Sequence, residues 1–330
     1  MLLQYPKIID LNDEDLIFWD RLNQDDEKIR FITIMKIAEE ERDDFLPWLH
    51  YALENDCSAL VRSEAAKHLE GWENPVTLNV LARALLDTDP EVVSAATQSL
   101  SEVKLQQSAR ILAPYLQLSA APVKIAILQA LRPLRDISLY EQIAQHVDHD
   151  DVLVRREAVS ALSWLQQERA ILSLSKIAQY DLDLETRRIA LGGLAYCKHI
   201  IPEVIAALSH GLEEGHWQLR QESALTIGKL NLNELEVDLI ALLEDQYWQV
   251  RIAIVRSLGR LKSKNALAGL TLNFNFEISN LRKEVALALG EIKGNDAEQL
   301  LLEHLKDPDP EVRKAIRIGL NQIQEFKDAH

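Results

Sequence analysis

The chain has few residues that interrupt helices. Among its 330 residues there are only 11 glycines and 10 prolines, whereas hydrophobic residues make up 47%. A β-sandwich or barrel needs many turns, and turns usually draw on glycine and proline. Their scarcity, together with frequent leucine and alanine, therefore favours a helical fold. The hydrophobic share is also too high for a disordered chain.

Cysteine is scarce as well. Cys57 and Cys197 are the two cysteines, and neither belongs to a C-x-x-C pair or to a metal-ligand spacing. We therefore expect reduced thiols in a reducing compartment. The first residues, MLLQYPKIID, show no basic leader followed by a long apolar run, and no stretch approaches the roughly 18 apolar residues of a membrane span. The sequence predicts a cytoplasmic protein with no membrane partner.

The chain has no basic excess. It carries 36 Lys and Arg against 52 Asp and Glu, a formal net charge of −16. Such a chain repels phosphate backbones, so a nucleic-acid partner is not expected. The acidity is greatest at the start, where residues 1–60 hold 15 acidic and 6 basic side chains. That end fits either a basic protein partner or an acidic, solubilising cap.

Common catalytic motifs are missing too. The sequence contains no GxxxxGK, GxGxxG, GxSxG or HExxH pattern. The nearest approach to a metal cluster is His146, Asp148 and His149, just before Asp151. Imidazole and carboxylate groups can hold a divalent ion, but turns also collect such residues because they are solvated. We predict no cofactor, and these three residues are the candidates if a metal is bound.

What the chain does contain is an internal repeat. A nine-residue phrase, aliphatic–Arg–x–x–small or aliphatic–x–x–x–Leu or Ile, has clear copies in VRSEAAKHL, VRREAVSAL and VRKAIRIGL. Ten copies follow one another 31 to 33 residues apart, which identifies a tandem structural repeat. Their first residues are Ile29, Val61, Val92, Val123, Val154, Thr186, Leu219, Val250, Leu281 and Val312.

Each copy follows a shorter amphipathic segment, so the unit is a hairpin of two helices, A and then B. Numbered from 0 at the first residue of the phrase, positions 0, +4 and +8 share one face of helix B. They are predicted to be buried, as with Val154, Ala158 and Leu162. Aspartates that can cap helix B precede it in five repeats. These are Asp26, Asp89, Asp151, Asp183 and Asp309.

The phrase resembles the HEAT-like repeats of phycobilin lyases and of deoxyhypusine hydroxylase over roughly residues 14–325. The resemblance implies an all-α fold, a right-handed α-α superhelix or solenoid of about ten hairpins. It also implies that helix B lines the concave side and that its +1 arginine forms a ladder with turn aspartates of adjacent repeats. Here the +1 residue is Arg or Lys in every copy except the third, which has Val93.

The expected organisation is a single solenoid over residues 1–330, with an N-terminal cap or flap over residues 1–24. The ten repeats are expected at about residues 14–40, 43–71, 74–103, 105–134, 138–165, 167–197, 200–230, 233–261, 263–292 and 295–325.

The enzymes of this repeat superfamily provide an alternative function. The resemblance to phycobilin lyases is limited to the repeat itself, and a bilin lyase would need a tetrapyrrole and partner subunits. Deoxyhypusine hydroxylase depends on His-Glu dipeptides that bind two irons, and this sequence contains no His-Glu dipeptide. The sequence therefore favours a non-enzymatic scaffold, adaptor or assembly factor that binds a protein partner on its concave face. A lyase-like or hydroxylase-like enzyme with a concave cofactor site is the alternative.

The concave face also yields candidate binding residues. If helix B is concave, positions −2, −1, +2, +3 and +6 point into the groove, and repeats six to eight supply arginine, glutamine and aromatic side chains there. Such a composition is typical of a binding hot spot. The predicted partner-binding residues are Arg188, Gly192, Trp217, Gln218, Gln221, Tyr247, Trp248, Ile252 and Arg256.

Two of these predictions leave alternatives open. Trp217 and Trp248 hold the same offset in successive repeats, so we expect them to stack along one ridge; packing over the inter-helix turn is the alternative. Gly192 and Gly193 lie inside a helix, where each glycine costs about 1 kcal/mol relative to alanine. The pair permits tight packing between hairpins or opens a notch beside Trp217.

The first repeat differs from the others. Phe31, Ile32 and Met35 occupy its groove positions, so its helix B is apolar nearly all round, whereas a terminal repeat normally has a polar outer face. We expect an N-terminal flap to cover it, with a dimer contact as the alternative. The apolar residues available for the flap are Leu2, Leu3, Tyr5, Ile8 and Ile9.

Overall fold

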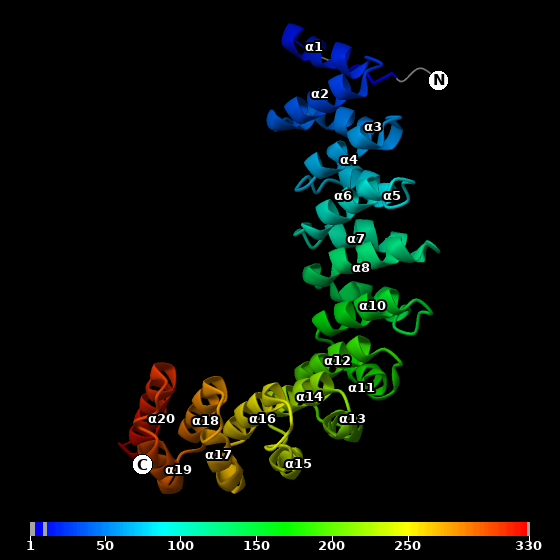
Figure 1. Cartoon of the computed structure of the whole chain (residues 1–330). Helices are drawn as coiled ribbons and strands as arrows, with labels where there is room; N and C mark the ends of the chain where they lie inside the picture. Colours follow the sequence, from blue (N-terminus) through cyan, green and yellow to red (C-terminus); the bar gives the residue numbers. More distant parts are fainter. Residues whose placement is uncertain (1–3, 9–11, 329–330) are drawn as a thin grey trace. The chain divides into compact units, whose positions relative to one another are not determined.

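The computed structural model describes residues 4–8 and 12–328, apart from the side chains of residues 13 and 14. These residues form twenty α-helices and seven short 3-10 helices (Figure 1). Over the described ranges, no helix has the length and apolar character required to cross a bilayer. The chain divides into two compact units, Met1–Leu165 and Gln166–His330.

The described part of unit 1 consists of five hairpins, in which an odd-numbered helix A precedes an even-numbered helix B (Figure 1). Short 3-10 helices extend three of the A helices. The helices are α1 (Asp13–Leu22), α2 (Glu27–Glu39), α3 (Leu46–Asn55), α4 (Ala59–His68), α5 (Pro75–Ala84), α6 (Pro90–Ser101), α7 (Ser108–Leu112), α8 (Ala121–Leu134), α9 (Tyr140–Ala144) and α10 (Val152–Trp164).

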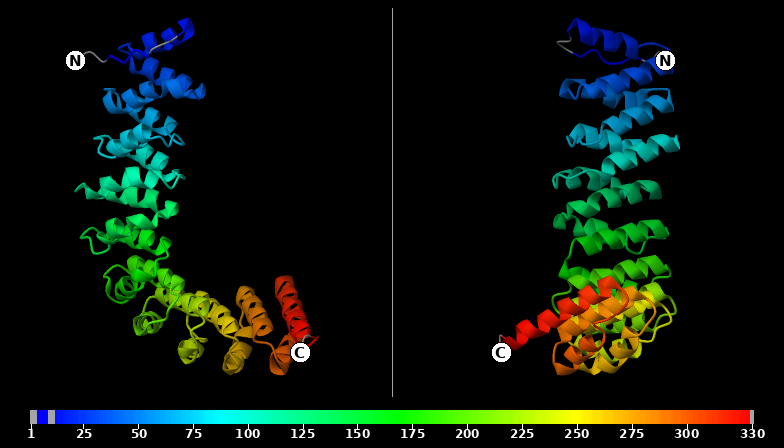
Figure 2. Two further views of the ribbon diagram at one scale, coloured as in Figure 1. Left: turned by 180° about the vertical axis from the view of Figure 1, so that it is seen from behind. Right: turned by 60° about the vertical axis from the view of Figure 1, so that its left-hand side comes forward.

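The described part of unit 2 repeats this arrangement in five further hairpins, and Figure 2 shows the hairpins of each unit side by side in chain order. Their helices are α11 (Ile171–Tyr180), α12 (Leu184–Gly193), α13 (Pro202–Glu213), α14 (Trp217–Leu230), α15 (Glu236–Ala241), α16 (Trp248–Arg260), α17 (Leu267–Phe274), α18 (Ser279–Ile292), α19 (Asn295–Glu303) and α20 (Pro310–Asp328).

The core of each unit runs along the B helices, as the phrase predicts. Val154, Ala158 and Leu162 are at most 1% exposed. Two residues at positions predicted to be buried are not: Ile29 in the first repeat is 38% exposed, and Leu320 in the last repeat is partly exposed. A repeat buries its apolar face only against its neighbours, so a terminal repeat leaves part of that face uncovered.

All five predicted caps are present at the starts of B helices. In each, a carboxylate oxygen of the aspartate accepts a hydrogen bond from a backbone N–H two or three residues further on. The bond satisfies an amide that the helix leaves unpaired and places negative charge at its positive end. The capping residues are Asp26, Asp89, Asp151, Asp183 and Asp309.

The arginine ladder implied by the resemblance is also present. The +1 guanidinium of one repeat pairs with a carboxylate at position −5 of the next repeat, two residues before the capping position. Arg220, for example, bonds to both carboxylate oxygens of Asp245 and to two backbone carbonyls of its own turn. Each guanidinium thereby ties two hairpins together. The pairs are Arg30–Asp56, Arg62–Asp87, Arg187–Glu214, Arg220–Asp245 and Arg282–Asp307.

The described part of the N-terminal segment packs against repeats one and two. The Tyr5 backbone donates to Asn23 and accepts from the indole of Trp19, both in or next to α1. Tyr5 is 1% exposed, its ring lies 4.9 Å from that of Tyr51, and its hydroxyl donates to Asp56 at 2.8 Å. Trp48 donates its indole N–H to the Pro6 carbonyl. The segment is held there because a buried phenol and an indole both find acceptors.

This segment nevertheless leaves the apolar groove face of repeat one uncovered. Ile32 is 50% exposed and Met35 is 36% exposed, so the expected flap, as far as it is described, does not shield them. The other proposed flap residues, Leu2, Leu3 and Ile9, lie outside the described residues. An apolar groove of about 410 Å³ lies beside Ile17, Ile29 and Ile32. A dimer contact at this end stays a prediction.

Candidate functional site

The predicted aromatic residues lie at the N-terminal ends of α14 and α16. The Trp217 ring stacks on Tyr247, with centroids 5.9 Å apart and planes 24° from parallel, and the guanidinium of Arg220 lies 5.9 Å from the Tyr247 ring. Trp248 follows directly and is 37% exposed. We expected Trp217 to stack on Trp248, but its ring partner is the preceding residue, Tyr247. Gln218 is exposed and Gln221 is half-buried nearby.

One predicted groove residue is in the core. Ile252 is 6% exposed and the adjacent Ala253 is 1% exposed, so the prediction that this part of α16 faces a partner is wrong. Helix α16 packs against α14 on one side and α18 on the other. In repeat eight this close packing buries positions +2 and +3 as well as the core positions.

The two predicted arginines are held in internal ion pairs. Arg188 bonds to Glu185 and to Glu222 of the next repeat. Arg256 makes two bonds, of 2.9 and 2.8 Å, to the buried carboxylate of Glu284. The hydrogen bonds from Arg256 lower the pKa of Glu284 below its ordinary value. A ligand would have to break these pairs to use either guanidinium.

Gly192 makes room for one of these carboxylates. A Cβ atom built on Gly192 would lie 2.9 Å from a carboxylate oxygen of Glu222. The space beside the glycine is thus filled by the acid that pairs with Arg188. The open notch is therefore absent at Gly192, where the nearest neighbours are side-chain atoms of Glu222 and not the backbone of the next hairpin.

The histidine turn of repeat five has a structural role. His149 takes position −5, where most other repeats have the ladder acid, and its Nδ1 accepts the backbone N–H of Asp151 at 3.0 Å. His146 is 6% exposed, and its Nε2 has no partner among the described atoms. Burial lowers its pKa, and the nearby charges of Lys124 and His149 add to that effect. Over the described ranges, no three His, Cys, Asp or Glu side chains group as metal ligands would.

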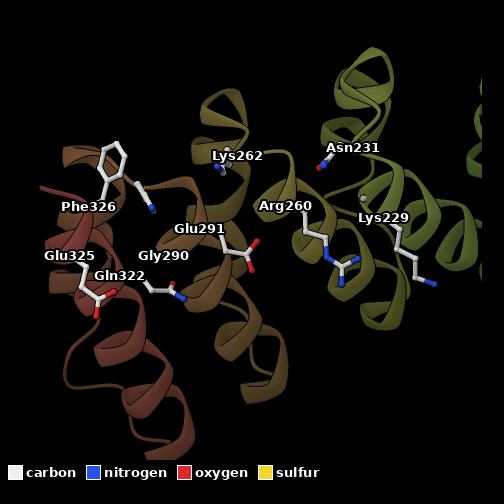
Figure 3. Close-up of a pocket in the computed structure, with 11 residues that line it drawn as sticks. Lys229, Asn231, Arg260, Lys262, Gly290, Glu291, Gln322, Glu325 and Phe326 are labelled. Atoms are coloured by element: carbon white, nitrogen blue, oxygen red, sulfur yellow. The ribbon is translucent and has the colours of Figure 1, made fainter. Parts of the chain in front are cut away.

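A second surface lies at the C-terminal ends of the B helices of unit 2. There an open groove of about 900 Å³ crosses α14, α16, α18 and α20, and we call it the B-helix groove (Figure 3). Its lining residues are Gly228, Lys229, Asn231, Arg260, Lys262, Gly290, Glu291, Lys293, Gln322, Glu325 and Phe326.

Most of these residues form two columns that follow the repeat. Position +10 is Lys229, Arg260, Glu291 and Gln322 in repeats seven to ten. Position +12 is Asn231, Lys262 and Lys293, all with positive φ, at 54°, 52° and 63°. This conformation ends each helix. Cationic side chains there also complement the partial negative charge of the helix C-terminus.

The cations of the B-helix groove are not used internally in the way that Arg188 and Arg256 are. In the described part of the chain, Lys229, Arg260 and Lys262 form no ion pair. Lys293 lies 4.4 Å from the ring of Phe326, a cation–π contact. Partial burial in the groove raises the pKa of Glu291, although Arg260 and Lys262 act in the opposite direction. The groove is therefore a cationic surface on an acidic chain.

Comparison with known families agrees with this repeat geometry. The family of HEAT repeats matches residues 20–101, 46–132 and 235–321, which together make up more than half of the chain. The chain belongs to the HEAT-repeat family. No curated protein matches the sequence.

Solved structures similar to this HEAT-repeat chain show the same fold. An engineered protein is 18% identical with a TM-score of 0.54, covering 95% of this chain and 99% of that one. YibA of Escherichia coli is 15% identical with a TM-score of 0.51, covering 98% and 99%. A mutant of Kap121p is 14% identical with a TM-score of 0.56, covering 98% of this chain and 43% of its own. At these identities the likeness concerns the fold alone.

The sequence reasoning missed the B-helix groove because it stopped at the end of the phrase. The groove residues follow the last buried position, +8, by two and four residues. Their signal was nevertheless in the sequence: cations recur at the 31-residue period of the HEAT repeat, in Lys229 and Arg260 and again in Lys262 and Lys293. Extending the internal alignment by four residues would have revealed both columns.

Proposed function

We propose that this HEAT-repeat protein is a non-enzymatic scaffold that binds a segment of a partner protein in the B-helix groove. One observation carries the proposal: a groove of about 900 Å³ crosses four successive B helices and presents three cations, Lys229, Arg260 and Lys262, that form no ion pair among the described residues. Repeat arrays suit this role because every repeat adds a helix to the same extended surface.

The aromatic cluster supports a contact on the same helices. Trp217 and Trp248 begin α14 and α16, whereas Lys229 and Arg260 lie at the C-terminal ends of these helices. Trp248 and Tyr247 are more than one-third exposed. Exposed aromatic side chains are enriched among residues that dominate binding energy. The cluster lies at the opposite ends of these helices from the groove, so a partner that contacts both would have to run along the helices as well as across them.

The thiols fit a cytoplasmic location for such a scaffold. Cys57 and Cys197 are both free, Cys57 being exposed and Cys197 buried. Structural disulfides are common in oxidising compartments and rare in the cytoplasm.

Photo-crosslinking in the source cells tests the proposed function. A photoreactive amino acid replaces Lys229 in the B-helix groove, Trp248 in the aromatic cluster, or Leu182, which is 97% exposed and lies outside both. We expect one protein to be cross-linked from Lys229, and from Trp248 if the partner reaches that far. Leu182 should give no such product.

Two results would contradict the scaffold. Cross-links that are equal at all three positions would mean that the groove has no special role. A stoichiometric pigment or transition metal in the purified protein, without a cross-linked protein, would instead support the enzyme alternative.

A further inference from the structure

We infer that the segment bound in the B-helix groove is acidic and extended, with a carboxylate at about every third residue and an apolar side chain near Phe326. The inference rests on the proposed function and adds the chemistry of the partner. It follows from the charges, the spacing and the ends of the groove.

The charges of the groove call for an anionic partner. Lys229, Arg260 and Lys262 are exposed and form no ion pair within the described ranges, and Lys293 is occupied only by an aromatic ring. Five other arginines of the B helices of unit 2 do pair with carboxylates, as Arg256 pairs with Glu284; the others are Arg187, Arg188, Arg220 and Arg282. Because the chain as a whole carries −16, a cationic groove is a local exception that would attract an acidic segment.

The spacing of the cations suits an extended chain. Lys229, Arg260 and Lys293 come from three adjacent B helices, and packed helices lie about 8–10 Å apart. A peptide in the extended polyproline II conformation advances about 3.1 Å per residue and returns every third side chain to the same face, so side chains three residues apart would meet successive helices. Carboxylates at that interval would each find a cation.

The far end of the groove is less charged. On α20 the lining residues are Gln322, Glu325 and Phe326, and the Phe326 ring is 41% exposed although Lys293 lies against it. An apolar side chain placed after the last carboxylate would cover this ring. Figure 3 shows Phe326 and Glu325 on the helix at one end of the groove, with Lys229 at the other.

The same groove is poorly suited to nucleic acid. Glu291 and Glu325 lie among the cations, and they would oppose the continuous charge of a phosphate backbone. A peptide can place its carboxylates selectively and leave neutral residues opposite these glutamates. The carboxylates of the groove therefore favour an acidic peptide over RNA or DNA.

Fluorescence anisotropy on the full chain tests the inference with three probes. The first is a labelled peptide with glutamate at every third position and a leucine at one end, the second is the same peptide with lysine in place of glutamate, and the third is a single-stranded oligonucleotide. We expect the glutamate peptide to bind and its affinity to fall with added salt. The lysine peptide and the oligonucleotide should bind at least about tenfold more weakly.

The chain itself supplies conservative variants for this test. Lys262→Asn and Lys293→Asn introduce the residue that repeat seven already has at +12, and Arg260→Gln introduces the +10 residue of repeat ten. Because these residues are tolerated at the same positions, the triple variant should fold like the parent. We expect it to bind the glutamate peptide about tenfold more weakly, as three exposed ion pairs would allow.

A control removes two positive charges outside the groove, as many as the double variant Lys262→Asn with Lys293→Asn removes inside it. Lys264→Asn with Lys306→Asn removes two exposed lysines that do not line the groove, and it should leave peptide affinity unchanged. If the control and the double variant Lys262→Asn with Lys293→Asn lost the same affinity for the glutamate peptide, overall charge and not the groove would explain binding. That result would overturn the inference.

The remaining outcomes separate this inference from the proposed function. If a protein is cross-linked from Lys229 but the glutamate peptide does not bind, the scaffold stands and the acidic partner is wrong. If the oligonucleotide binds instead, and the triple variant abolishes that binding, the groove is a nucleic-acid site. If the peptide binds the groove but no cellular protein is cross-linked there, the proposed function fails while the groove chemistry stands.

Discussion

At the residue scale, the +1 side chain of the arginine ladder never faces a missing acid unchanged in both identity and partner. In two of the three places where position −5 lacks a carboxylate, the +1 residue is replaced: Val93 precedes a repeat with Leu118 at −5, and Lys124 precedes one with His149. Arg251 precedes Phe276 and lies 4.6 Å from its ring instead of bonding to an acid. A buried guanidinium without a partner is costly. Where the acid is missing, the +1 position therefore carries the neutral Val93, Lys124 donating to the Leu116 carbonyl, or Arg251 beside an aromatic ring.

The pH dependence of stability should reflect the break in the ladder at repeat five. Burial lowers the folded-state pKa of His146 below its ordinary value of 6.5, with Lys124 and His149 acting in the same direction. The unfolded chain therefore binds the proton more readily, and stability is lost as pH falls below 6.5 towards the lower folded-state pKa. We expect the melting temperature of the parent to drop between about pH 7 and about pH 5.

Replacing the histidine isolates its share of this loss. His146→Leu should melt with a shallower pH dependence than the parent over the same range, although His50, whose pKa is also lowered by burial, keeps part of the slope. His199→Gln is the control, because the His199 side chain is 85% exposed. An unchanged slope in His146→Leu would show that this histidine is protonated equally in the folded and unfolded chains.

At the scale of the helix, glycine governs how closely the last B helices approach. Position +9 is Gly228, Gly259 and Gly290 in repeats seven to nine. A Cβ atom there would lie 2.6 to 2.9 Å from backbone Cα atoms of Ser257, Ala288 and Gly319 in the next helix. These small residues bring the helix ends together beside the B-helix groove, which places its two columns on adjacent backbones.

Alanine at one of these glycines should destabilise the protein, although alanine is the better helix former. Gly290→Ala places a methyl group 2.6 Å from the Cα atom of Gly319, so we expect a loss of about 1–3 kcal/mol in unfolding free energy. Gly192→Ala is the matched control, because its methyl would meet only the mobile end of Glu222. That variant should be neutral or up to about 1 kcal/mol more stable. Urea unfolding of both variants measures the difference, and equal effects would mean that the helices can separate freely.

At the scale of the whole molecule, a repeat array is stabilised mainly by contacts between neighbours. A local defect should therefore weaken nearby hairpins and spare distant ones. Ala158 is fully buried between the hairpins of unit 1, and Ala158→Asp would place a charge there without a partner.

Hydrogen exchange can locate the effect of that substitution. We expect Ala158→Asp to reduce the unfolding free energy of unit 1 by about 3 kcal/mol or more and to accelerate amide exchange in α8 and α10. Exchange in α18 and α20 should match that of the parent, because those helices belong to unit 2 and have their own neighbours. Uniform acceleration across all helices would mean that the chain unfolds as one cooperative body.

Much of this protein could be predicted from its sequence alone. The 31-residue period, the buried face of helix B and the aspartate caps all depend on residues close together in the chain, whose relations are set by helix geometry. A cap forms within one turn of the chain, and the helical period alone places Ala158 on the face that a neighbouring repeat covers. These predictions therefore agreed with the structure except at the ends of the array.

The availability of a side chain to a partner could not be predicted in this way. Arg256 and Arg260 have the same side chain and lie one turn apart on α16, yet Arg256 bonds to Glu284 and Arg260 faces the B-helix groove. The repeat pattern predicts that Ile252 faces the groove, but its side chain is buried. In each case the outcome depends on how close the next helix comes and which side chain it presents. Only tertiary packing decides that distance, because it follows from small residues such as Gly259 and Ala288 on separate repeats.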